Sequence, residues 1–175
     1  MTFQSIIKST SIFLLKLTSF IPALFVMYCI YSFSAQEGTT SSQLSSGVSQ
    51  KIVVTVDKIF DFNLTSAQIS KGSDKIEHYI RKTAHFTEYF ILAVTVSIPL
   101  YVFGIRGIWL VLTSMLLCTG FACLDEYHQL FVNGRSGSPK DVLIDSVGSF
   151  TGIICTRIAG YIARKTIFEP LFQKK

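Results

Sequence analysis

Four apolar stretches divide the chain, and each is long enough to cross a membrane as a helix. They cover residues 12–33, 86–103, 107–127 and 141–163, and a membrane-spanning helix needs about 20 mostly apolar residues. The third stretch has no charge over residues 107–124, whereas the fourth contains Asp145 and Arg157. The pattern predicts an all-α polytopic membrane protein. We expect a four-transmembrane-helix bundle in a single domain of residues 1–175.

The first apolar stretch also has features of a signal peptide. Lys8 and Lys16 precede its uninterrupted apolar part, residues 17–33, and the small residues Ser34 and Ala35 follow it. Phe33 would stand three residues before a cut after Ala35, where a small residue is preferred, although a cut after Ser34 fits the pattern. The sequence favours a retained span and leaves cleavage as the alternative.

The segment between the first two spans, residues 34–85, is expected to be an outer loop with helical parts. Residues 36–49 are rich in Gly, Ser, Thr and Gln, which is typical of a flexible turn. Residues 48–60 have apolar positions at helical spacing with charges between them. This predicts an amphipathic helix in the membrane interface or against the bundle. Asp74 and Glu77 have the spacing of a capping box, so we expect a new helix to begin there and to continue into the second span.

Composition agrees with a membrane protein. Of the 175 residues, 49% are hydrophobic and 15% are charged, and the mean hydropathy is +0.46, whereas a soluble domain has about 25% charged residues. These values argue against a water-soluble globule and against disorder. The formal net charge of +5 does not indicate a nucleic-acid partner, because in a membrane protein the location of Lys and Arg decides their meaning.

The location of the basic residues predicts the topology. The short loop 125–141 has two basic residues, Arg135 and Lys140. The other end of the predicted bundle has Lys8, Lys16, Arg106, Arg164, Lys165, Lys174 and Lys175. Because short loops rich in Lys and Arg stay in the cytoplasm, we expect both termini to be cytoplasmic. Loops 34–85 and 125–141 are then outside.

Polar residues gather at the outer ends of the last three spans. Most of these residues are three or four positions apart on their helix, and Glu126 is next to Asp125. The three groups are Arg81, His85 and Glu88, then Asp125, Glu126 and Gln129, and then Asp141 and Asp145. The predicted topology brings all three groups to one depth. Ionisable groups there should face the bundle interior and pair. The alternatives are pairing that only joins the helices, and a binding or catalytic site.

The turn at residues 133–139 has the sequence of an anion-binding turn. Ser138 is a good N-cap and Pro139 suits the first helical position, so a helix is expected to begin there. Free N–H groups and the positive end of the helix dipole, beside Arg135, favour a phosphate or a carboxylate. In the alternative interpretation, Asp141 satisfies the helix start and Arg135 lies in solvent.

Other kinds of site have weaker support. His85, Glu88, Asp125, Glu126 and His128 are of the types that bind divalent metals, but the chain has no H-E-x-x-H motif and no nearby cysteine, so we predict neither a metal nor another cofactor. The GRSGS segment of the turn differs from the G-x-S-x-G elbow of hydrolases.

Three segments together form a recognisable set of motifs. They are RKTAHFTEYFIL at 81–92, DEYHQLFVNGRSGSPKDVLIDSVGSFTG at 125–152, and FSAQ at 33–36 followed by a Ser-rich turn. In order and over nearly the whole chain, they resemble the signatures of the VanZ-like family. The resemblance implies a multi-pass protein of the bacterial cell membrane. It also implies an association with low-level resistance to the glycopeptide teicoplanin.

The resemblance marks signature positions but brings no established reaction. Many members have Asn at the position of Asp145, so this chain has a carboxylate there in place of an amide. Any role of this position that requires an amide is therefore in doubt for this chain. By position, the signature residues are Lys82, His85, Glu88, Asp125, Glu126, Gln129, Arg135, Ser136, Asp141 and Asp145.

Three hypotheses for the function follow. The first is a pocket at the outer face that binds an anionic envelope component, either a lipid phosphate or a cell-wall precursor, through Arg81 and the signature residues. The second is a membrane enzyme acting on a lipid or cell-wall headgroup, with acid–base candidates His85, Glu88, Asp125 and Glu126. The third is a small proton-coupled transporter that uses Glu88 and Asp145. Membrane lipids are the expected partners, a glycopeptide is a further candidate ligand, and the sequence does not indicate an oligomeric state.

Overall fold

The computed structural model describes residues 3–168, and all of its elements there are helices. They are α1 (Phe3–Thr18), α2 (Ile21–Ser34), α3 (Gly38–Phe60), α4 (Ser66–Val102), α5 (Gly107–Gln129), α6 (Pro139–Ala163) and the π-helical segment η1 (Arg164–Phe168). Four segments are long and apolar enough to span a membrane: Ser9–Ser34, Ser66–Val102, Gly107–Gln129 and Pro139–Thr166. The predicted all-α architecture with four spans is confirmed. Lys174 and Lys175, which we assigned to the cytoplasmic face, lie outside the described residues.

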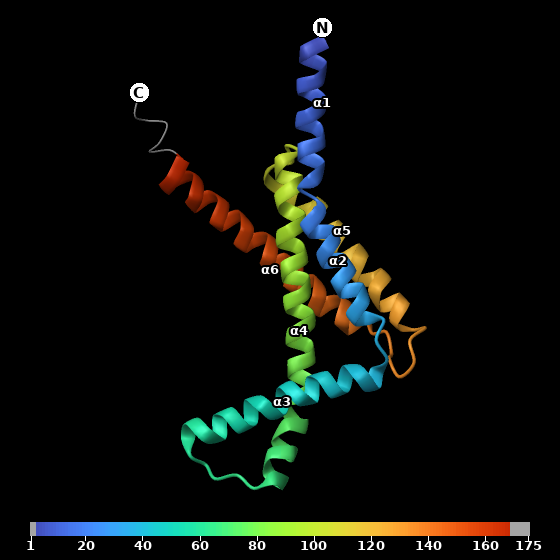
Figure 1. Ribbon diagram of the computed structural model, residues 1–175, viewed down its shortest axis with the longest axis vertical. Helices are drawn as coiled ribbons and strands as arrows, with labels where there is room; N and C mark the ends of the chain where they lie inside the picture. The colour runs from blue at the N-terminus through green and yellow to red at the C-terminus, as the bar shows by residue number, and fades with distance from the viewer. Residues whose placement is uncertain (1–2, 169–175) are drawn as a thin grey trace.

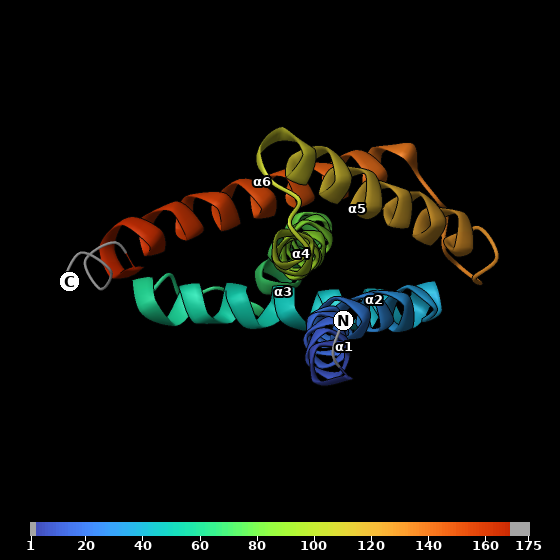
Figure 2. The same cartoon turned by 90° about the horizontal axis from the view of Figure 1, so that it is seen from above.

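Helix α4 is the centre of the molecule. Seen from above it stands end-on, with α5 and α6 on one side and α1, α2 and α3 on the other (Figure 2). It packs mainly on α6 and also contacts α2, α3 and α5. The start of α1, the turn between α4 and α5, and the end of α6 lie at one end of the molecule, away from α3 (Figure 1). The assignment of that end to the cytoplasm rests on charge and stays a prediction.

Small residues let α6 approach the backbone of α4. A Cβ atom added at Gly148 or Gly152 would overlap the carbonyl oxygen of Phe86 or Phe90, and Ser149 between the two glycines is fully buried. Close backbone approach through small residues is the usual way in which membrane helices gain packing contacts. This glycine face also fixes the depth of α6 beside α4, and with it the height of the polar residues near the start of α6.

Large apolar side chains are exposed along every span. Leu24 of α2, Ile98 of α4, Leu116 of α5 and Ile158 of α6 are between 49% and 74% exposed. An exposed apolar surface of this extent is characteristic of a membrane or partner interface rather than of a soluble monomer. These side chains mark the surface that faces lipid tails.

The segment between the first two spans, residues 34–85, is more helical than expected. The flexible turn predicted for residues 36–49 is wrong, because α3 already begins at Gly38. Ser45 and Ser49 are buried against the bundle, and the Ser45 hydroxyl donates to Glu77 Oε1 of α4 at 2.8 Å. Packing on α4 therefore offsets the low helix propensity of a Ser-rich and Gly-containing sequence.

The second part of α3 has the predicted amphipathic character. One apolar row of this helix stays between 40% and 68% exposed, and it consists of Leu44, Val48, Ile52, Val56 and Ile59. An exposed apolar row on a helix at the end of the spans suits the boundary between headgroups and acyl chains. In the views of Figures 1 and 2, α3 crosses α4 rather than running parallel to it.

Helix α4 begins earlier than predicted. The expected start at Asp74 is wrong, because the helix begins at Ser66 with Thr65 as its N-cap. The backbone N–H of Thr65 donates to Gln68 Oε1 at 2.8 Å as part of a capping box. A helix of 37 residues is about 55 Å long, whereas the hydrocarbon core is about 30 Å thick. The first part of α4 therefore extends beyond the membrane beside α3.

Candidate functional site

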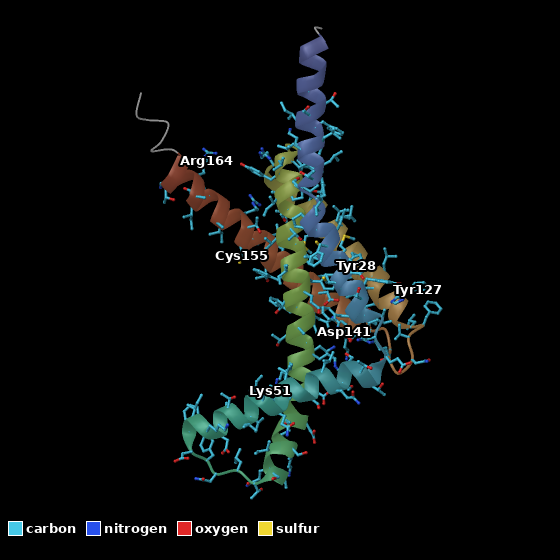
Figure 3. All side chains as sticks on the ribbon, viewed as in Figure 1. Tyr28, Lys51, Tyr127, Asp141, Cys155 and Arg164 are labelled. Carbon is cyan, nitrogen blue, oxygen red and sulfur yellow. The ribbon has the colours of Figure 1, made fainter. Side chains whose placement is uncertain are left out.

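The polar residues of the last three spans converge where α3 meets the bundle. His85 Nδ1 of α4 lies 4.0 Å from Asp145 Oδ1 of α6 and 3.9 Å from Glu88 Oε2. Asp141, at the start of α6, pairs with Lys82 of α4, and its label stands beside α4 in Figure 3. The predicted convergence of the second and fourth spans is confirmed. Two adjoining cavities open among these residues.

The large cavity has a volume of about 650 Å³. It lies between α3, α4, the turn at 130–138 and the start of α6. Its charged lining residues are the cations Arg81, Lys82, Arg135 and Lys140 and the carboxylate Asp141. Asp141 pairs with Lys82, and Arg81 pairs with Glu77, so Arg135 and Lys140 give the cavity a positive excess. Gln129, Ser136 and Ser138 add polar groups to the wall.

Arg135 joins two parts of the chain that are distant in sequence. Its Nε donates to the carbonyl of Gln36 at 2.8 Å, and its Nη2 donates to the carbonyl of Phe33 at 2.9 Å. The N–H of Gly38 donates to the carbonyl of Asn133 at 3.0 Å. The FSAQ motif and the GRSGS turn therefore hold each other, and the interpretation with Arg135 in solvent is wrong.

The guanidinium of Arg135 keeps donors for a ligand. Two of its five N–H groups have acceptors among residues 3–168, which leaves three. Burial lowers the pKa of this guanidinium, and the Asp125 carboxylate opposes the shift. Because arginine starts from a pKa above 12, the group remains a cation at neutral pH. It borders both cavities.

The start of α6 is held by α5 and by its own cap. The Ser138 hydroxyl accepts from the N–H of Lys140 at 3.3 Å, and Glu126 Oε2 accepts from the N–H of Ser138 at 2.7 Å. The predicted N-cap at Ser138 is confirmed. Asp141 was an alternative for satisfying the helix start, but its side chain reaches across to Lys82 of α4. Glu126 therefore fixes the turn, and Asp141 ties α6 to α4.

The small cavity has a volume of about 200 Å³ and a different character. Its walls are largely apolar, from Ile30, Phe33, Leu44, Val48 and Ile80. Two carboxylates, Glu88 and Asp125, also line it. It shares Ser41, Arg81, His85 and Arg135 with the large cavity, so these four residues separate the two spaces.

Several buried polar atoms of this region have no hydrogen-bond partner within residues 3–168. They include Ser34 Oγ, Arg81 Nε, His85 Nδ1, Tyr89 OH, Asp125 Oδ1, Glu126 Oε1 and both carboxylate oxygens of Asp145. Asp125, Glu126 and Asp145 are at most 5% exposed. Nearly all buried polar groups in proteins are hydrogen-bonded. Mutual pairing of these side chains therefore does not account for the cluster, which has capacity to bind further polar groups.

The motifs that form the site also decide the family. The VanZ/LLP1 family model matches residues 19–160. The chain belongs to the VanZ/LLP1 family. The matched segment contains α2 through the main part of α6, including all of the predicted site residues, so the resemblance inferred from the motifs is confirmed. The chain shows no match to a curated protein or to a solved structure.

In this VanZ/LLP1 protein, the structure unites most of the predicted site residues. Arg81, Lys82, Gln129, Ser136 and Asp141 line the large cavity. Glu88 and Asp125 line the small cavity, Glu126 and Asp145 are buried, and His85 and Arg135 border both spaces. Within residues 3–168, no group of three or more potential metal ligands is placed to hold an ion.

Sequence reasoning missed some residues of the site in this family member. Ser41 and Ser42 of α3 were assigned to a flexible turn, yet both line the large cavity, and Ser42 Oγ accepts from Arg81 Nη2 at 3.0 Å. Tyr89 was also missed, although it directly follows Glu88 inside the first long motif. That position was a usable signal, because a tyrosine that is fully buried in a span needs a partner for its hydroxyl.

Proposed function

We propose that the protein binds an anionic component of the cell envelope in the large cavity. The ligand group is the phosphate of a lipid headgroup or of a lipid-linked cell-wall precursor. The observation that carries this proposal is the positive excess of the cavity, in which the carboxylate Asp141 is already paired with Lys82. Arg135 and Lys140 have no ion pair among the described residues, and together with Arg81 they face a space at the level of the headgroups.

The geometry of the lining supports a phosphate in particular. The planar guanidinium of Arg135 has three N–H groups left, and such a group grips a phosphate through two parallel bonds. The turn at 134–138 lies at the N-terminus of α6, where the positive end of the helix dipole favours an anion. A volume of about 650 Å³ is in the usual range of ligand pockets.

The proposal includes the side of the membrane. With both termini in the cytoplasm of a bacterial cell, the cavity opens at the outer face of the cell membrane. Teicoplanin carries an acyl chain and acts at that face. We therefore propose that a ligand held in the cavity lowers teicoplanin susceptibility, as the family resemblance implies.

Titration calorimetry on the purified protein tests the anion site. Short-chain phosphatidylglycerol should bind, and short-chain diacylglycerol, which lacks the phosphate, should not. Lys140→Gln and Arg81→Gln should each weaken binding about tenfold or more, because a charge-assisted hydrogen bond is worth roughly 1.5–3 kcal/mol. Arg106→Gln is the matched control, since Arg106 precedes α5 at the opposite end of the bundle.

Equal affinity of the wild-type protein for phosphatidylglycerol and diacylglycerol would contradict the proposal. So would an equal affinity of Lys140→Gln, Arg81→Gln and Arg106→Gln for phosphatidylglycerol. Added salt should weaken binding of phosphatidylglycerol, because it screens the exposed cations of the cavity. In a host whose teicoplanin susceptibility depends on this protein, Lys140→Gln should change the susceptibility and Arg106→Gln should not.

A second candidate function is acid–base catalysis on the bound headgroup. The observation in its favour is the position of His85, which borders the large cavity and lies 3.9 Å from Glu88 and 4.0 Å from Asp145. An imidazole beside carboxylates is a common general acid or base in enzymes. Turnover of a lipid headgroup by purified protein, lost in His85→Gln, distinguishes catalysis from binding. The transport hypothesis would instead require proton-dependent flux in proteoliposomes.

A further inference from the structure

The two carboxylates of the small cavity form no ion pair with a Lys or Arg among the described residues. Glu88 has a side chain that is 29% exposed, and its Oε2 lies 3.9 Å from His85 Nδ1. Asp125 is only 3% exposed, and its Oδ1 has no hydrogen-bond partner within residues 3–168. Its Oδ2 accepts from Gln129 Nε2 at 3.3 Å. Two carboxylates with unused acceptor capacity therefore face one cavity.

The two arginines at the border of the small cavity form their hydrogen bonds with groups other than Glu88 and Asp125. Arg81 Nη2 donates to Glu77 Oε1 at 2.9 Å, and the Arg135 fork faces the backbone carbonyls at the end of α2. In the described part of the chain, neither Glu88 nor Asp125 lies within 4.0 Å of a Lys or Arg nitrogen. The small cavity thus has room for a positive group that pairs directly with Glu88 and Asp125, as the two arginines at its border do not.

The chemistry of the walls specifies the kind of cation. A primary ammonium is compact and carries three donors, which matches the free acceptors of Glu88 and Asp125. The walls are largely apolar, and hydrogen bonds to charged groups are stronger in such surroundings. A volume of about 200 Å³ admits a small alkylamine.

The two cavities adjoin at Arg81, His85 and Arg135, so one ligand can reach both. We propose that the ligand is a zwitterion, with a phosphate in the large cavity and a primary amine between Glu88 and Asp125, as in an aminophospholipid headgroup. This inference rests on the proposed binding of a phosphate in the large cavity, and it adds the amine to the ligand.

A matched pair of lipids tests the amine. Short-chain phosphatidylethanolamine and short-chain phosphatidylethanol both have a phosphodiester, and the ethanolamine lipid has an ammonium group in place of one hydrogen atom of the terminal methyl group. Calorimetry on the wild-type protein should give about tenfold or more tighter binding of the ethanolamine lipid, because a hydrogen bond from a charged donor contributes at least that much. Equal affinities would refute the amine site and leave the phosphate site standing, whereas no binding of either lipid would refute both.

Two variants test whether Glu88 and Asp125 bind the ammonium group of the ethanolamine lipid. Glu88→Gln and Asp125→Asn should each reduce the preference for the ethanolamine lipid, while binding of phosphatidylethanol stays equal or improves because a negative charge is gone. Asp74→Asn is the matched control, since Asp74 is an exposed acid of the same helix α4, and it should keep the full preference. A preference that survives in both Glu88→Gln and Asp125→Asn would place the amine elsewhere and overturn the inference.

A pair of soluble phosphate esters tests whether the ligand is a membrane lipid or a free phosphoamine. Phosphoethanolamine and ethyl phosphate differ by the same ammonium but lack acyl chains. A preference seen with the soluble pair as well as with the lipids indicates a site for free phosphoamines, and a preference confined to the lipids indicates a membrane lipid. Either result keeps the zwitterionic chemistry, which stands or falls with the wild-type comparison even if a variant fails to fold.

Discussion

Replacement of Arg135 by alanine should detach α2 from the turn before α6. The side chain makes two hydrogen bonds to main-chain carbonyls, at 2.8 Å to Gln36 and at 2.9 Å to Phe33. Each charge-assisted bond is worth roughly 1.5–3 kcal/mol. Both carbonyls lie near the surface and can turn to water, so we take the lower value for each. The expected loss is then about 3 kcal/mol in the free energy of unfolding.

Thermal denaturation of the purified protein in detergent, followed by circular dichroism, measures this loss. For a chain of this length, 1 kcal/mol shifts Tm by roughly 2–4 °C, so Arg135→Ala should melt about 6–12 °C below the wild type. Arg135→Lys retains the charge without the fork and should fall in between. Ligand binding by either variant is to be measured well below its Tm, so that stability and affinity stay separate.

Arg106→Ala is the matched control for the denaturation. Arg106 also donates to carbonyls, but these belong to Tyr101 and Ile105, within five residues of it. Its loss cannot separate distant elements, and the Tm should change little. If Arg135→Ala melts at the same temperature as Arg106→Ala, the bonds between the two motifs contribute no net stability and the reasoning fails.

Two other features of the structure give further predictions. Gly152→Ala should destabilise the protein by about 1–3 kcal/mol, because the new Cβ would overlap the Phe90 carbonyl. Gly160→Ala is the control and should be neutral, because no atom lies within 4 Å of its new Cβ. Equal melting temperatures of the two variants would exclude a close contact between α4 and α6. Ser136→Cys, in a background without the native cysteines, should react with a membrane-impermeant maleimide added to intact cells, and labelling only after the cells are opened would reverse the topology.

The spans were predictable because length and hydropathy decide them locally. The start of α4 was not predictable, since two candidate capping boxes begin within ten residues of each other. Thr65 and Gln68 form the real one, while Glu77 turns to Ser45 and Arg81. That choice depends on α3 packing along the same stretch of α4, which is information from elsewhere in the chain.

The composition of the site was predictable from shared depth, but its connections were not. Helical spacing placed His85 and Asp145 at one level, and they lie 4.0 Å apart. The partners of Arg135 are the carbonyls of Phe33 and Gln36, and a carbonyl carries no sequence signal because every residue has one. The division into a cationic and an apolar cavity likewise depends on α3, whose first half was assigned to a flexible turn.

The bonds of Arg135 also determine when the protein can finish folding during its synthesis. Arg135 follows Phe33 by 102 residues and Gln36 by 99. Ribosomes add about 5–20 residues per second, so the first span waits roughly 5–20 s for this partner. Until then its last carbonyls are hydrated, and α3 has no turn to dock on. Both cavities therefore form late, and a chain that terminates before residue 135 has the first three spans without the site they surround.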